Sequence, residues 1–293
     1  MVNYRNTPII ELESKFASGA SVRLFLKRED LNHPSVSGNK WWKLKFNLEQ
    51  ALKSQHKSVL TFGGAFSNHL YATSAAASDL GLNSIGIVRG EETLPLNPTL
   101  AFCAKQGMQL HYISREQYKE KDQEDFIESL REKLGDFYLI PEGGTNALAV
   151  KGCEEWAMQI RAELDFDYLC LPVGTGGTMA GMINILKDKS IIGFSSLKGG
   201  SFLEGEIKPW LTNETPNWGI ETQYHFGGYA KTNSELNEFI DEFERSYSIP
   251  LDRVYTAKMM FGLKDLIKQK KFERGSRILA LHTGGLQGRT ISS

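Results

Sequence analysis

Strand and helix patterns alternate along most of the chain, and this alternation limits its fold more than any other feature. Short apolar segments that predict buried strands lie at residues 59–62, 84–88, 168–172 and 278–281. Between them lie longer segments with apolar residues at helical spacing. Such alternation is typical of a parallel sheet covered by helices on both faces. Because the intervals are too short for one sheet of this many strands, the sequence predicts two α/β layers with a site between them.

The same patterns predict the remaining elements. Further strands are expected at residues 22–26, 109–113, 137–140 and 191–196. Helices are expected at residues 39–52, 69–80, 99–106, 115–134, 147–164 and 179–187, and around residues 236–243 and 263–267. Residues 199–233, rich in Gly, Asn and Thr, are expected to be mostly loop.

Composition excludes several classes of function. A net charge of −1 over 293 residues lacks the basic excess of a nucleic-acid-binding protein. No apolar run approaches the roughly 18 residues that a membrane span needs. The three cysteines, Cys103, Cys153 and Cys170, stand far apart, which favours reduced thiols in a cytoplasmic protein. No cluster has metal-ligand spacing, so no metal site is expected.

Lys40 is the first residue that suggests chemistry. It follows Asn39, a residue suited to cap a helix, and therefore lies where a helix dipole is positive. A neutral amine in this position would be a nucleophile of the kind that forms a Schiff base with a carbonyl group. The alternative is that Lys40 is one of several lysines on the surface of an amphipathic helix.

A glycine-rich turn at residues 173–178 follows an apolar strand and opens a helix. Its glycines let backbone N–H groups converge on one anion, and Thr175 and Thr178 add hydroxyl donors. The turn lacks the Lys-Ser/Thr pair of a Walker A loop and the glycine spacing of a dinucleotide site. It therefore predicts a mononucleotide-like phosphate site, or else an ordinary tight turn between strand and helix.

Four segments, taken together, resemble the family of 1-aminocyclopropane-1-carboxylate (ACC) deaminases and D-cysteine desulfhydrases. They are Gly38–Lys40 with Lys43–Leu44, residues 62–69, residues 172–178, and residues 254–258 with 282–285. The resemblance spans residues 28–285 and implies pyridoxal 5′-phosphate as cofactor in a fold like that of the tryptophan synthase β subunit (fold type II). It also implies a small domain of residues 50–148 inserted into a large one of residues 1–49 and 149–293, a small amino-acid substrate, and a homodimer.

The resemblance also assigns roles to residues. It implies catalytic roles for Lys40, which binds the cofactor covalently and takes the α-proton of the substrate, and for Ser67, Tyr229 and Tyr255. The cofactor-binding residues that it implies are Lys40, Asn68, Gly174, Thr175, Gly176, Gly177, Thr178, Thr256 and Thr283. Capping of a helix alone would also explain Ser67, and either tyrosine could be an ordinary buried aromatic residue. Lys43 and Lys258 are expected at the surface or behind the site.

The choice of substrate depends on positions where this chain departs from its relatives. Thr256 and Thr283 stand where ACC deaminases tend to carry Glu and Leu, and a hydroxyl stabilises a protonated pyridine ring less than a carboxylate does. This favours elimination of sulfide from D-cysteine, giving pyruvate and ammonia, over deamination of ACC to 2-oxobutyrate. Phe66 replaces the usual Gln, and Trp41–Trp42 replace smaller or basic residues. An alternative of another class is a non-catalytic protein that binds a phosphate ligand.

Overall fold

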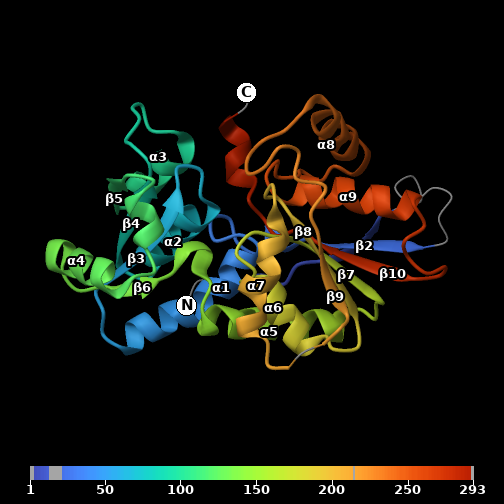
Figure 1. The fold of residues 1–293 in the computed structure, drawn as a ribbon, viewed down its shortest axis with the longest axis horizontal. Coiled ribbons are helices and arrows are strands. Elements are labelled where there is room, and N and C mark those ends of the chain that lie inside the picture. Colours follow the sequence, from blue (N-terminus) through green and yellow to red (C-terminus); the bar gives the residue numbers. More distant parts are fainter. Residues whose placement is uncertain (1–2, 13–21, 214, 292–293) are drawn as a thin grey trace.

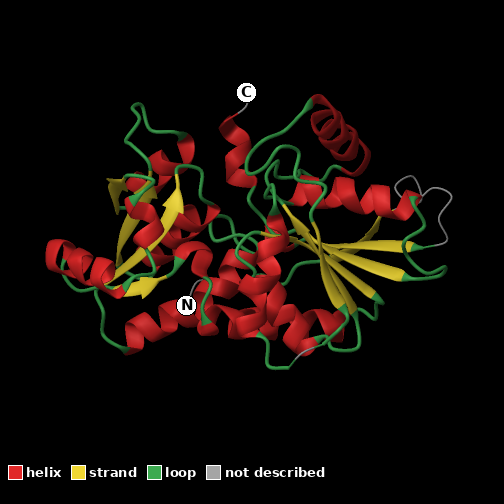
Figure 2. Cartoon of the chain, viewed as in Figure 1, coloured by secondary structure: helices red, strands yellow, loops and turns green. Residues whose placement is uncertain are grey.

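The computed structural model describes residues 3–12, 22–213 and 215–291, and its strands form two separate sheets. Figure 1 shows the smaller sheet on the left and the larger one on the right, and Figure 2 shows helices around both. The α/β class and the two helix-covered, mainly parallel sheets expected from the sequence are confirmed. None of the described helices is long and apolar enough to cross a membrane.

The larger sheet has six strands in the order β1-β2-β10-β7-β8-β9. Its strands are β1 (Ile9–Leu12), β2 (Arg23–Lys27), β7 (Tyr168–Val173), β8 (Ser190–Ser195), β9 (Trp218–Glu221) and β10 (Arg277–Leu281). The pairs are parallel except that β1 runs antiparallel to β2 at one edge. In β10, Leu279 and Leu281 join one core cluster while Ile278 and Ala280 join another, so both faces of this strand are buried.

The smaller sheet has four parallel strands in the order β5-β4-β3-β6. They are β3 (Ser58–Gly64), β4 (Asn83–Arg89), β5 (Met108–Ile113) and β6 (Tyr138–Ile140). All four lie between residues 50 and 148, the stretch for which the small domain is expected; the domain boundaries themselves stay a prediction.

Helices cover the faces of both sheets (Figure 1). The longer ones are α1 (Asn39–Lys53), α2 (Asn68–Asp79), α3 (Pro98–Lys105), α4 (Glu124–Leu134), α5 (Ala147–Glu163), α6 (Gly177–Ile185), α8 (Ser234–Tyr247) and α9 (Thr256–Lys268). The short ones are α7 (Leu203–Ile207) and the 3-10 turns η1 (Glu29–Leu31), η2 (Gln117–Glu120), η3 (Glu142–Gly144), η4 (Gly200–Phe202), η5 (Lys208–Trp210) and η6 (Leu286–Ile291). Helices α8 and α9 pack on one face of the larger sheet, and α1, α5 and α6 belong to the core cluster of the other face.

Two sequence expectations about these elements are wrong. Asn39 does not cap α1: Gly38 is the cap residue, and the Asn39 side chain instead donates to Oγ1 of Thr178, 2.9 Å away. The helix expected at residues 115–134 is two elements, η2 and α4, because Tyr118 turns inward and is buried at 4% exposure. Residues 199–233 are mostly loop, as expected, and they also contain α7 and the edge strand β9.

Candidate active site

A cavity of about 600 Å³ is lined by residues that follow strands of both sheets. Ser67 follows β3, Glu142 follows β6, Gly174 follows β7 and Thr283 follows β10, while Arg89 is the last residue of β4. Ligands of open α/β sheets bind at these carboxyl ends of the strands. The predicted site residues that line the cavity are Lys40, Ser67, Asn68, Gly174, Thr175, Gly176, Thr178, Tyr229, Tyr255 and Thr283.

Lys40 lies in the first turn of α1, and the backbone before it is tightly constrained. Gly38 has φ +70°, and a Cβ atom there would lie 1.8 Å from the carbonyl oxygen of Thr283. Only glycine fits such a conformation and such a contact. The N–H of Asn39 donates to that same oxygen at 3.3 Å, which joins the start of α1 to the loop after β10.

Burial lowers the pKa of Lys40 to about 8, with Cys153 opposing the shift slightly. An amine with this pKa is partly neutral near physiological pH and so can act as a nucleophile or accept a proton.

Lys43 also lines the cavity, a position that the sequence did not predict for it. The side chain is 1% exposed, lines the cavity, and donates from Nζ to Thr145 Oγ1 at 2.8 Å and Thr175 Oγ1 at 3.3 Å. Burial, and then the charge of Lys40, lower its pKa well below the ordinary value. Of the two positions expected for Lys43, at the surface or behind the site, the surface is therefore wrong. The spacing of three residues from Lys40, which puts both on one helix face, could have indicated it.

The glycine-rich turn and Lys43 form a concave group of donors. Gly176 has φ +80° and precedes α6, whose first backbone N–H groups have no carbonyl partner within the helix. Cβ atoms on Gly176 and Gly177 would lie 2.6 Å from Ile207 and 2.9 Å from Thr145, so the backbone is packed closely from behind. With Lys43, Thr175 and Thr178 beside it, this turn can bind an anion through backbone and side-chain donors.

Ser67 caps α2, because its Oγ accepts from the backbone N–H groups of His69 and Leu70, both at 3.2 Å. It also lines the cavity, as expected from the sequence. Asn68 follows at the start of α2, and its Oδ1 accepts a hydrogen bond from Gln287 in η6. Phe66 is 44% exposed and is not among the residues that line the cavity.

His69 lines the cavity in a defined tautomer. Thr61 Oγ1 lies 2.7 Å from the carbonyl oxygen of Ile140, to which it must donate, and 2.8 Å from His69 Nε2. Nε2 must therefore carry the proton, and Nδ1 is an acceptor that has no partner among the described residues. Burial, followed by the charges of Lys40 and Lys43, lowers the pKa of His69 well below its ordinary value. The side chain is thus a neutral, buried acceptor.

The two predicted tyrosines lie together. Their rings meet edge to face with centroids 6.1 Å apart. Burial raises the pKa of Tyr255 well above its ordinary value, and Tyr229 and Asp252 raise it further. Both hydroxyls therefore keep their protons at neutral pH, since burial also raises the pKa of Tyr229.

The two threonines differ in placement. Thr283 is 8% exposed and lines the cavity, and it also lines a smaller hollow shared with Lys40 and Asn68. Thr256 is fully buried at the start of α9, behind Tyr255, and is not among the cavity-lining residues; nor is Gly177.

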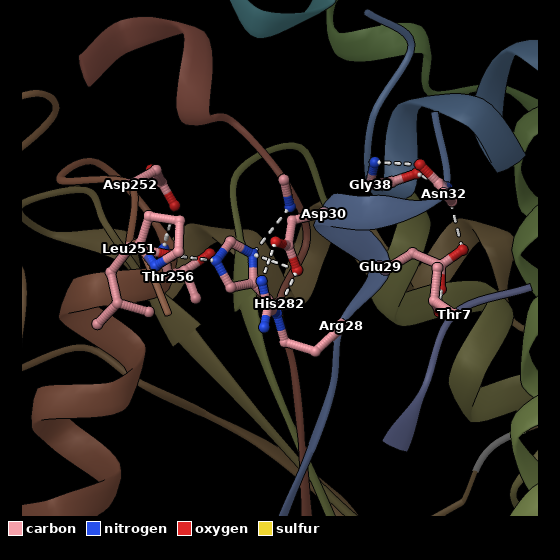
Figure 3. A network of polar contacts seen from close by, with 12 residues as sticks. Thr7, Arg28, Glu29, Asp30, Asn32, Gly38, Leu251, Asp252, Thr256 and His282 are labelled. Atoms are coloured by element: carbon pink, nitrogen blue, oxygen red, sulfur yellow. Dashed lines mark hydrogen bonds and ion pairs between the residues drawn. The ribbon is translucent and has the colours of Figure 1, made fainter. Parts of the chain in front are cut away.

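A buried polar network stands behind these residues (Figure 3). Arg28 donates two bonds to Asp30, at 2.9 and 2.8 Å, and Asp30 lies 3.7 Å from His282 Nδ1. His282 Nε2 must donate to the carbonyl of Pro250, 2.7 Å away, because a carbonyl can only accept. Asp252 accepts from the N–H groups of residues 254–256 at 3.0, 2.8 and 2.6 Å and so caps α9. The network connects the end of β10, which precedes Thr283, to the loops that precede Lys40 and Tyr255.

A second branch of the network fixes the loop before α1. Glu29 is fully buried and accepts from Thr7 Oγ1 at 2.8 Å, Asn32 Nδ2 at 3.0 Å and Trp42 Nε1 at 2.7 Å. Asn32 also donates to the carbonyl of Gly38 at 3.0 Å. Trp42 stacks on Trp156, with ring centroids 6.1 Å apart, so its ring belongs to the core and not to the cavity.

Comparison with known proteins agrees with this arrangement. A family model described as pyridoxal-phosphate dependent enzyme matches residues 1–284. One relative is the Arabidopsis thaliana protein named bifunctional D-cysteine desulfhydrase/1-aminocyclopropane-1-carboxylate deaminase, mitochondrial. It is 32% identical to this chain over an alignment of 303 positions, and the alignment covers 90% of this chain and 73% of that protein.

Solved structures give the same result. A crystal structure described as an ACC deaminase homologue has a TM-score of 0.84 and 29% identity, covering 98% of this chain and 92% of that one. The O-acetylserine dependent cystathionine beta-synthase of Helicobacter pylori shares the fold, with a TM-score of 0.71 and 16% identity over 99% of this chain and 97% of that one.

The chain therefore belongs to the family of pyridoxal-phosphate dependent enzymes, with the tryptophan-synthase-β-like architecture of fold type II. Within that family it groups with the ACC deaminases and D-cysteine desulfhydrases.

The residues present fit the cofactor. Lys40 offers a partly buried amine of lowered pKa, and the turn at residues 174–178 offers a concave group of backbone and hydroxyl donors. Lys43 adds a buried cation, or a neutral donor, directly at Thr175. Lys40 would hold the aldehyde end of pyridoxal phosphate, and the cradle with Lys43 would hold its phosphate.

Proposed function

We propose that this enzyme is a lyase that eliminates sulfide from D-cysteine, with water, to give pyruvate and ammonia. What supports D-cysteine over ACC is the chemistry at the deep end of the cavity. Thr283 lies there beside Lys40, and the carboxylates that line the cavity, Asp122, Glu142 and Glu206, belong to other segments. Asp252, the buried carboxylate near Thr256, is engaged by three backbone N–H groups.

Pyridoxal phosphate, when bound, supplies a ring that draws electron density from the α-carbon of the substrate. Lys40 would hold the cofactor, and its Nζ could take the α-proton of the substrate, because a pKa of about 8 leaves part of the amine neutral. Tyr255, which keeps its proton, can donate it to the leaving sulfur. Ser67 and Asn68 present hydroxyl and amide groups on the opposite side of the cavity.

Thr283 lines the cavity and would offer the cofactor ring a neutral hydroxyl, while Thr256 is fully buried behind Tyr255, so neither position brings a carboxylate to the ring. This favours a reaction whose leaving group carries charge away. A thiolate leaving group carries charge away, whereas opening a cyclopropane that lacks an α-hydrogen requires stronger stabilisation of negative charge by the cofactor ring. A difference of about 3 kcal/mol in carbanion stabilisation would correspond to roughly a hundredfold in rate.

The test compares keto-acid release from D-cysteine and from ACC by the wild type and by a double variant, Thr256→Glu with Thr283→Leu. The wild type should favour D-cysteine, and the double variant should shift the ratio of rates toward ACC. Thr256→Gln with Thr283→Leu is the control, since it has nearly the same shape without the added charge. Faster release of 2-oxobutyrate from ACC than of pyruvate from D-cysteine by the wild type would overturn the proposal.

A further inference from the structure

Arg89 lies at the mouth of the cavity, which we define by the exposed lining residues Arg89, Asp122, Phe202, Glu206 and Tyr229. We infer that Arg89 binds an anionic group at the far end of the substrate's β-substituent. The cavity would then accept amino acids that carry a second acid group on a thioether arm. This inference rests on the proposed β-elimination and extends it from D-cysteine to a substrate class.

The charges around the cavity leave Arg89 without an acidic partner. Lys121 lies 3.1 Å from Asp122 and 3.6 Å from Glu142, so both of these lining carboxylates have the same cationic partner, and the three side chains together carry one negative charge. Within residues 3–12, 22–213 and 215–291, Arg89 has no carboxylate oxygen within 4 Å. A guanidinium has a planar fork of donors that matches a carboxylate in a bidentate manner. A ligand carboxylate is therefore the group that this site lacks.

The guanidinium of Arg89 is held in place by a rigid support. Its Cζ lies 5.5 Å from the ring centroid of Tyr118. Tyr118 is 4% exposed, donates from its hydroxyl to Glu142 Oε1 at 2.8 Å, and packs edge to face on Phe62. Stacking on a fixed aromatic ring reduces the conformational freedom that Arg89 would lose when it binds a ligand.

The position of Arg89 suits the far end of a substrate. It is paired with Gly64 across the sheet, and Nη2 lies 3.7 Å from the point that a Cβ atom on Gly64 would occupy. Ser67 follows three residues later and lines the same cavity. Arg89 also lies close enough to Tyr229 to lower the pKa of that hydroxyl, an effect smaller than the increase that burial causes. Arg89 thus faces the space between Ser67 and Tyr229.

The remaining lining residues near the mouth suit an apolar arm. Leu197, Leu203 and the 54% exposed Phe202 line the cavity on the side of the larger sheet. A thioether with a short carbon chain can contact them while its terminal carboxylate reaches Arg89.

The test uses the holoenzyme and two substrates that differ in one charge, S-carboxymethyl-D-cysteine and S-carbamoylmethyl-D-cysteine. In the reaction of the first, the Cβ–S bond breaks, mercaptoacetate leaves with the electron pair, and water yields pyruvate and ammonia. The wild type should prefer the carboxymethyl compound by roughly tenfold or more in kcat/KM, as expected for one charge-assisted hydrogen-bonding pair. Arg89→Gln should remove this preference, and Glu206→Gln, a change of charge at the same mouth, should keep it.

Binding is measured separately, by titrating each compound against the visible absorption of the bound cofactor. If neither compound yields pyruvate but the wild type binds the carboxymethyl compound more tightly and Arg89→Gln does not, the elimination proposal fails and the inference about Arg89 stands. Equal binding of both compounds by the wild type would overturn the inference. So would an equal loss of affinity for both in Arg89→Gln, which would assign Arg89 to the α-carboxylate that they share.

Discussion

The two walls of the cavity differ in how their polar groups are satisfied. The wall from the larger sheet carries Lys40, the glycine-rich turn and Tyr255, and a buried network that includes Glu29 and His282 holds it from behind (Figure 3). The wall from the smaller sheet carries His69 Nδ1 without a partner and Arg89 without an acid, among the described residues.

This difference suggests a division of labour. Groups that are fully bonded within the protein are costly to move and suit a fixed cofactor and its chemistry. An exposed group with free bonding capacity, such as Arg89, suits a ligand that changes from one turnover to the next, whereas His69 Nδ1 is buried. Changes in the wall from the larger sheet should therefore abolish function or stability, and changes in the other wall should have smaller and more selective effects.

The largest effect is expected for Lys40→Ala. Turnover should fall by about a thousandfold or more, because the amine that holds the cofactor and moves the proton is lost. Lys43→Ala is the matched control on the same helix face: it should keep the visible absorption band but release the cofactor faster on dialysis. A Lys40→Ala protein with a borohydride-reducible chromophore would show that another amine does this work.

Gly38→Ala should destabilise the fold by at least about 4 kcal/mol, because its Cβ would overlap the carbonyl oxygen of Thr283. Gly199→Ala is the control, since Gly199 has a similar φ of +73° and nothing within 4 Å of the added Cβ. That change should cost only the strain of the left-handed conformation, about 1–2 kcal/mol. Urea denaturation of both variants measures the difference, and equal costs would mean that the contact between α1 and the loop after β10 is not tight.

Glu29→Ala tests the network behind the wall. Three buried donors, on Thr7, Asn32 and Trp42, would lose their acceptor, at a cost of about 3 kcal/mol or more in the free energy of unfolding. Glu49→Ala, an exposed change on α1, should stay within about 0.5 kcal/mol of the wild type. If the two variants unfold at the same urea concentration, the network contributes little.

The smallest effect is expected for His69→Gln, and it depends on pH. Because the pKa of His69 is lowered in the folded state, the unfolded chain binds a proton at this residue more readily than the folded chain does. The contribution of neutral His69 to the free energy of unfolding is therefore complete above about pH 6.5 and is lost as the pH falls below that value. Between about pH 6.5 and 5 the wild type should lose at most about 1.4 kcal/mol per pH unit from this residue, and the variant should be spared that loss. Parallel slopes of stability against pH would contradict a neutral His69.

The strands and helices of the interior could be predicted because burial on both faces makes them continuous apolar runs, as in residues 168–172. Strand β9 escaped prediction because it lies at a sheet edge, where half-buried residues give no clear pattern. The helix expected at residues 115–134 looked continuous because nothing local shows that Tyr118 turns inward to bond Glu142.

The cavity was predicted better where a residue lies in a recognisable segment than where tertiary contacts define its role. Lys40, Ser67 and the turn at residues 174–178 belong to segments with their own pattern. The positions of Lys43 and Arg89 in the cavity depend on contacts with residues distant in sequence, Thr175 for Lys43 and Tyr118 for Arg89. No local pattern fixes which of two lysines three residues apart carries the chemistry.

One measurement tests the assignment of the chemistry to Lys40 most directly. The purified holoenzyme is reduced with borohydride, digested, and its peptides are mapped by mass spectrometry for the covalently attached cofactor. Attachment is expected at Lys40, the partly buried amine whose pKa is lowered to about 8. Attachment at Lys43 or Lys258, or no attached cofactor in a yellow protein, would contradict it.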